Sequence, residues 1–196
     1  MATEKVNLPG SQHEEPIPQQ PPQRVFHIYL DGISHRHVTI TDSDKKTAIY
    51  KIDANSGSIF SSKPHMSIYR CGPSQTLVGA ITFHSMSSDI DVEIHGKAAS
   101  LCKGGLFTRT YEFRSQAAGT ALWWKGDGAF SSDLKLVGAK DAQGSEQVFA
   151  RFDRSAMAMS KEGKLLLASG LDEIATDEVV VSGMAVIEHA RRKRNE

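Results

Sequence analysis

The sequence predicts a mainly β fold: an antiparallel, closed β-barrel of about twelve strands around a central hydrophobic C-terminal α-helix. Two observations lead to this prediction. Over residues 24–169, short segments of alternating apolar and polar residues recur about every 8–15 residues, as strands do in sandwiches and barrels. The last part of the chain holds an apolar run with no polar face, and a helix of that kind must be surrounded by other elements. A closed sheet around the helix satisfies both patterns.

The alternating segments end where turn-forming residues cluster. Asp31-Gly32 closes the first segment, and Gly104-Gly105 is a two-residue hairpin signal between two later ones. Residues 90–95 alternate throughout, with three aliphatic residues on one face and two acids and a histidine on the other. Strands are therefore expected over residues 25–30, 46–52, 66–71, 76–84, 90–95, 98–103, 106–114, 120–125, 134–140, 146–153 and 164–169.

The charge distribution favours a helix at about residues 173–193. Acidic residues stand at its start and basic residues at its end, which is the arrangement that the helix dipole stabilises, and Thr176 is the expected N-cap. Residues 179–187 are apolar on nearly every face. Their three consecutive valines are also compatible with a strand, but the length of the segment and the charge gradient favour the helix. Nine helical residues span only about 14 Å, which suits the inside of a small barrel.

The chain is expected to form a disordered tail and one domain. Residues 1–24 hold five of the seven prolines and few residues able to build a core, so we expect disorder there and a single domain over residues 25–196. Lys plus Arg and Asp plus Glu are both 23, which argues against a general nucleic-acid binder. No apolar run is long enough to span a bilayer. The N-terminus lacks a secretory signal and only Cys71 and Cys102 are present, so we expect a cytoplasmic protein.

No motif predicts catalysis, a metal or a cofactor. The chain lacks the G-x-S-x-G, H-E-x-x-H and Cys-His signatures, and Gly126-Asp127-Gly128 fits a hairpin turn better than a nucleotide-binding loop. His35 and His37 share a strand face near Asp31, but nothing local supplies the further ligands that a closed metal site needs. We therefore expect no catalytic residue, no metal ligand and no cofactor.

Two features are candidate binding sites. Trp123 and Trp124 are adjacent and point to opposite faces of a strand, so one belongs to the core and the other is exposed; Trp124 is the candidate contact for a partner or a lipid headgroup region. The second feature is the basic stretch Arg191, Arg192, Lys193 and Arg194. It is compatible with a helix end that satisfies the dipole, with weak attraction to anionic lipids, or with nuclear import. No lipidation signal accompanies it.

Residues 25–194 resemble the tubby C-terminal-like superfamily, which includes tubby proteins, phospholipid scramblases and plant LURP-one-related proteins. The resemblance is to its small uncharacterised fungal members, and it lies in diffuse, mostly apolar motifs. These are Trp123-Trp124, Lys164-Leu165-Leu166-Leu167, and Leu171-Asp172-Glu173-Ile174 leading into Val179-Val180-Val181 and Glu188.

The resemblance implies a twelve-stranded barrel around a central helix. Because tubby members bind phosphoinositides, it also implies a non-enzymatic intracellular protein that binds phosphoinositides, other anionic lipids or a protein partner. The headgroup-binding residues of tubby have no matching motif here, and the palmitoylated cysteine stretch of the scramblases is missing. The alternative hypothesis is an enzyme with a site on the barrel rim, which a cluster of histidines or carboxylates in one apolar pocket would favour.

Overall fold

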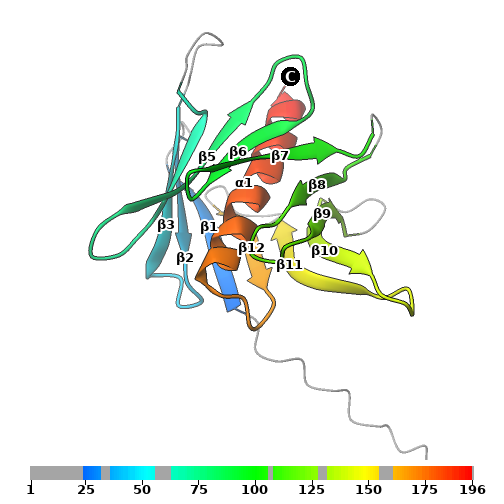
Figure 1. Cartoon of the computed structure of the whole chain (residues 1–196). Coiled ribbons are helices and arrows are strands. Elements are labelled where there is room, and N and C mark those ends of the chain that lie inside the picture. Colours follow the sequence, from blue (N-terminus) through cyan, green and yellow to red (C-terminus); the bar gives the residue numbers. More distant parts are fainter. Residues whose placement is uncertain are drawn as a thin grey trace, which may run out of the picture.

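The computed structural model describes residues 24–31, 36–55, 63–105, 108–127, 132–154 and 161–195. In this part of the chain, twelve antiparallel strands form one closed barrel around a single C-terminal helix (Figure 1), so the predicted fold class is confirmed. Residues 1–23 of the expected tail lie outside the described residues. The first described strand begins at Arg24.

Each strand pairs with its neighbours in the chain, and the first pairs with the last to close the barrel. In the closing pair, Arg24 lies opposite Leu167 and Tyr29 opposite Lys161. The strands are β1 (Arg24–Asp31), β2 (His37–Thr41), β3 (Ala48–Ala54), β4 (Met66–Arg70), β5 (Thr76–Phe83), β6 (Ile90–Ile94), β7 (Lys97–Lys103), β8 (Tyr111–Arg114), β9 (Ala121–Gly126), β10 (Leu134–Lys140), β11 (Glu146–Arg154) and β12 (Lys161–Leu167), followed by α1 (Glu173–Asn195).

The sequence analysis missed strand β2. Only two aliphatic residues, Val38 and Ile40, alternate in it, which is a weaker signal than that of the other strands. Both side chains are buried in the barrel. Pairing with β1 and β3 on either side therefore fixes β2, although its own pattern is short.

The connections between strands alternate between the two ends of the barrel, because every strand runs opposite to its neighbours. We call the end at which α1 begins the base and the end at which α1 finishes the mouth; the mouth is uppermost in Figure 1. The odd-numbered strands finish at the mouth. Residues far apart in sequence, such as the last residues of β7 and β11, therefore meet around the end of the helix.

Residues 179–187 of α1 fill the barrel, as predicted. Every side chain in this run is buried, with at most 6% exposure. Gly183 lies against the indole of Trp124 on β9, where an added Cβ would come within 3.0 Å of the ring. Strand β9 therefore packs closely on the Gly183 face of the helix. Seven aliphatic side chains of this run enter the same core cluster as the inward residues of the strands.

The prediction that Trp124 is a surface contact is wrong. Trp124 is fully buried, and its indole N–H donates to Ser182 Oγ on α1 at 2.9 Å. Trp123 faces the other side of β9, where its N–H donates to Glu112 at 3.0 Å. Alternation correctly places the two indoles on opposite faces, but it does not say which face lies against the helix.

The helix is capped one turn earlier than expected. Asp172, and not Thr176, is the N-cap: its carboxylate accepts from the Ala175 N–H at 2.7 Å. Thr176 lies inside the first turns, and its hydroxyl donates to the carbonyl of Asp172 at 2.7 Å. Gly170, at φ +83°, turns the chain from β12 into this cap.

Two buried carboxylates attach the start of α1 to the base of the barrel. Asp177 is fully buried and accepts from Tyr50 at 2.7 Å and Arg70 Nε at 3.2 Å, while His95 Nε2 lies 2.9 Å away. Burial raises the pKa of the Tyr50 phenol, so this group stays a donor. His95 thus belongs to the same network as Tyr50 and Arg70.

Glu178, the second carboxylate, is held by the β8–β9 connection. It accepts from the backbone N–H groups of Gln116 at 2.9 Å and Ala117 at 3.1 Å, and from the Ser115 hydroxyl. A buried charge with this many donors fixes both the depth and the rotation of the helix, because any displacement leaves the carboxylate without partners.

Leucine at position 183 is expected to destabilise the protein by about 1–3 kcal/mol, because the extra side chain overpacks against Trp124. Urea unfolding of Gly183→Leu measures this change. Ala98→Leu, on the exposed face of β7, introduces the same side chain and should stay within about 0.5 kcal/mol of the wild type. Equal stability of the two variants would contradict the packing of Trp124 on the helix.

Candidate anion-binding site at the mouth of the barrel

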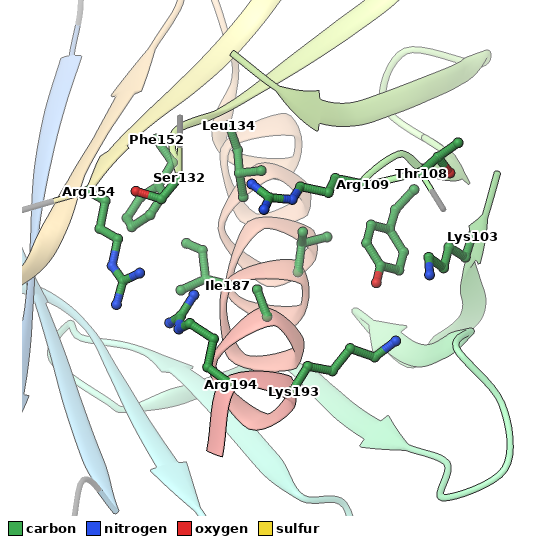
Figure 2. Close-up of a pocket in the computed structure, with 13 residues that line it drawn as sticks. Lys103, Thr108, Arg109, Ser132, Leu134, Phe152, Arg154, Ile187, Lys193 and Arg194 are labelled. Atoms are coloured by element: carbon green, nitrogen blue, oxygen red, sulfur yellow. The ribbon is translucent and has the colours of Figure 1, made fainter. Parts of the chain in front are cut away.

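A hollow of about 400 Å³ opens at the mouth, between the last turns of α1 and the neighbouring strands. Figure 2 shows basic side chains around it: Arg154 and Arg194 lie on one side of the helix and Lys103 and Lys193 on the other, with Arg109 between them. Five basic side chains line the hollow: Lys103, Arg109, Arg154, Lys193 and Arg194.

The topology of the barrel brings these cations together. Lys103 is the last residue of β7 and Arg154 the last residue of β11, and both strands finish at the mouth. Arg109 precedes β8 in the connection from β7. Lys193 and Arg194 come from the last turn of α1. Four separate segments therefore contribute positive charge to one space, although only two of the five cations are close in sequence.

The floor of the hollow is apolar. It consists of Tyr111, Leu134, Phe152, Val186 and Ile187, all of them buried. Charges beside such a floor are less screened by water than charges on an open surface, which strengthens their attraction for an anion.

No carboxylate is among the described residues that line the hollow. Two lie close by and accept backbone hydrogen bonds from residues of the rim. Asp133 accepts from the Arg154 N–H at 2.8 Å, and Asp89 accepts from the Lys103 N–H at 2.9 Å. Among the described residues, the lining of the hollow thus holds five basic and no acidic side chains.

The four basic residues predicted at the end of the helix separate into two pairs. Lys193 and Arg194 line the hollow, as a binding role would require. Arg191 and Arg192 instead form ion pairs with Glu188 at 2.8 and 3.0 Å, and the Arg192 guanidinium lies 4.3 Å from the centre of the Phe83 ring. Arg191 and Arg192 thus secure the end of the helix on the barrel.

A second hollow, of about 420 Å³, lies beside another face of the last turns of α1. Lys193 lines both hollows. Three histidines line it: His65, His84 and His189. His65 Nδ1 accepts from the backbone N–H of Phe83 at 3.2 Å. Burial, and then the neighbouring Arg192 and His84, lower the pKa of His65. His84 Nε2 lies 2.8 Å from Asp91.

Tyr111 and His189 connect the two hollows. The Tyr111 hydroxyl lies 2.6 Å from His189 Nδ1, and the His189 ring stacks on Phe83 with 6.0 Å between ring centres. Burial, together with the nearby Asp89 carboxylate, raises the pKa of Tyr111 to about 12. The phenol therefore stays protonated at neutral pH. Its contact with His189 holds the end of α1 against β8.

The other candidate groups of the sequence do not gather into a site. Across the part of the chain that the structure describes, no group of three His, Cys, Asp or Glu side chains is placed to hold a metal ion. His37 Nδ1 instead lies 2.8 Å from Asp53, and His35 is outside the described residues. Cys71 and Cys102 are both free thiols. None of the described helical residues form a segment long and apolar enough to cross a membrane.

Lys103, Arg109 and Arg154 were missed by the sequence analysis. Each is a single basic residue at or near the end of a strand, with no motif around it. The available signal was topological: in an up-and-down barrel, every second strand end lies at the same rim, so basic residues at the ends of alternate strands converge.

Removing the Tyr111 hydroxyl is expected to reduce the loss of stability between pH 10 and 12. The unfolded chain releases this proton near pH 10, before the folded chain does, so the wild type loses free energy of unfolding as the pH rises through this window. Tyr111→Phe removes that loss, at a cost of about 1 kcal/mol from the broken hydrogen bond at neutral pH. Urea unfolding of both proteins near neutral pH and above pH 10 measures the difference. An equal loss of the free energy of unfolding in the two proteins above pH 10 would contradict the raised pKa of Tyr111.

One comparison with known proteins gives an assignment. Residues 34–193, which include all of the strands except β1 and nearly all of α1, match the family described as "Family of unknown function (DUF6593)". Searches of curated proteins and of solved structures found no significant match. The matched span includes four of the five cations of the mouth hollow, and Arg194 lies just outside it. The chain therefore belongs to the DUF6593 family.

Proposed function

We propose that the protein is a non-enzymatic binding module for anionic membrane lipids, with the lipid phosphate held in the hollow at the barrel mouth. The observation that carries the proposal is the convergence of five cations, from four segments of the chain, above an apolar floor. Phosphate groups suit this arrangement, because guanidinium groups donate paired hydrogen bonds to phosphate oxygens and lysine adds a mobile point charge.

The expected affinity for a charged bilayer is moderate. Each basic residue near an anionic membrane surface contributes about 1 kcal/mol, so five together contribute about 5 kcal/mol at low salt. This attraction decays with distance over a Debye length of about 8 Å at physiological ionic strength. Binding should therefore weaken as salt is added.

The resemblance to the tubby C-terminal-like superfamily suggests the class of lipid. A barrel around a central helix is the architecture that the resemblance implies, and phosphoinositides are the ligands it suggests. The proposal places the protein in the cytoplasm, where the anionic leaflet of the plasma membrane is accessible.

One observation favours the alternative, an enzyme with its site on the barrel rim. His65, His84 and His189 line one hollow, and the pKa of His65 is shifted. Against this alternative, His65 Nδ1 accepts from the backbone N–H of Phe83 and His189 Nδ1 lies 2.6 Å from the Tyr111 hydroxyl, so both nitrogens are engaged by the barrel itself. Hydrolysis of simple phosphate and carboxylate esters that is lost in His84→Asn would favour the enzyme.

Replacing Arg109, Arg154 and Arg194 together by glutamate is expected to abolish binding to vesicles that contain phosphatidylserine or a phosphoinositide. The change turns three attractive charges of the hollow into repulsive ones, so a loss of more than 100-fold is expected. Vesicle sedimentation at low and physiological salt measures binding, with neutral phosphatidylcholine vesicles as the reference.

Glutamate at Lys46, Lys97 and Lys140 provides the matched control. All three lysines are exposed and lie toward the base, and the variant has the same net charge as the mouth variant. This control should retain most of the binding. Equal loss in both variants would show that only net charge matters, and no vesicle binding by the wild type would overturn the proposal.

A further inference from the structure

We infer that the β5–β6 connection is a membrane-docking tip whose Met86 side chain inserts into an anionic bilayer beside the cationic hollow. This inference rests on the proposed function and adds an orientation to it: the mouth of the barrel faces the membrane. The partner is a lipid surface, and the residue that enters it is apolar.

Met86 is the first observation. Its side chain is 99% exposed, which is unusual for a large apolar residue that has a barrel core available to it. The described chain exposes two other large apolar side chains, Leu77 at 50% and Ile174 at 53%. Leu77 is near the start of β5 and Ile174 is in the first turn of α1, so both lie at the base. Among these three residues, Met86 alone lies at the mouth.

The composition of the connection is the second observation. Met86 is flanked by Ser85, Ser87 and Ser88, which are small and uncharged. The following acid, Asp89, is fixed at the barrel rim, because its carboxylate accepts from the Lys103 N–H and its own N–H donates to Ser87 Oγ at 3.0 Å. The tip can therefore enter the headgroup region without carrying a charge into it.

The position of the connection is the third observation. Residues 85–88 line the second hollow together with Arg192 and Lys193, and Lys193 Nζ lies 3.4 Å from Ser88 Oγ. Lys193 also lines the first hollow, so the tip is next to the cationic site. Figure 1 shows the connection beside the C-terminal end of α1.

Together these features place an exposed apolar side chain, the hydroxyl groups of three serines and two basic side chains next to one another at the mouth. Interfacial proteins use the same combination, with apolar groups below the phosphate level and basic groups at it. The charge of the mouth is complementary to an anionic bilayer, which is the partner that the tip would enter.

The test compares Met86→Ser with Leu77→Ser in the full-length protein, using phosphatidylcholine vesicles that contain phosphatidylserine. Loss of the inserted side chain should weaken vesicle binding by about tenfold or more, whereas the same change at the base should leave it unaltered. Met86→Phe should bind at least as tightly as the wild type. Both positions are largely exposed, so thermal unfolding should stay close to that of the wild type.

A soluble probe separates the tip from the hollow. Binding of inorganic pyrophosphate, measured by calorimetry, reports on the cations alone and should be the same in Met86→Ser and the wild type. Wild-type vesicle binding by Met86→Ser would overturn the docking tip and leave the proposed function intact. A wild type that binds pyrophosphate but no vesicles would overturn the tip and assign the hollow to a soluble phosphate ligand. Binding of neither probe would overturn the proposed function as well.

Discussion

The apolar helix inside the barrel is the constraint on which the rest of the structure depends. Residues 179–187 have no face that tolerates water, so the strands must surround them, and a sheet can surround a helix only by closing on itself. Closure gives every strand two neighbours and removes the exposed edges of the sheet. Ser182, the one polar side chain in the run, is satisfied by the Trp124 indole N–H and by the carbonyl of Glu178.

The charged side chains at the two ends of the helix are engaged differently. At the base, Asp177 and Glu178 are buried and accept from donors on the strands and on the β8–β9 connection, so these charges hold the helix in place. At the mouth, Glu188 engages only two of the four basic residues that follow it. Lys193 and Arg194 extend into the hollow, where they meet the cations of β7 and β11. The same helix therefore anchors itself at one end and contributes two cations to the hollow at the other.

The local patterns of the sequence were enough to predict the barrel and its helix, and they failed where packing partners decide the outcome. Alternation and turn residues indicated eleven of the strands, but β2 has only two alternating aliphatic residues, and pairing with its neighbours fixes it. The adjacent tryptophans had to point to opposite faces, and Trp124 is the inner one, on the same face of β9 as Leu122 and against Gly183 of the helix. Thr176 resembled a cap, but Asp172 provides the carboxylate one turn earlier.

The sequence predicted only part of the candidate site, for the same reason. The basic stretch at the end of α1 is contiguous and easily recognised, whereas Lys103, Arg109 and Arg154 are single residues whose proximity depends on the closed topology. Met86 gives no sequence signal, since a lone methionine in a serine-rich turn fits a core or a surface equally well. The order of strand pairing and the alternating strand directions bring these residues together at the mouth. Composition alone does not predict this.

Native-state hydrogen exchange of the α1 backbone tests the central-helix architecture most directly. If the barrel encloses residues 179–187, their amides can exchange only when the whole barrel opens. The free energy obtained from their exchange should then equal the global free energy of unfolding measured with urea, and it should match that of the most protected strand amides. Rapid exchange of residues 179–187 while the strands stay protected would show that the helix leaves the barrel independently, and would contradict the account.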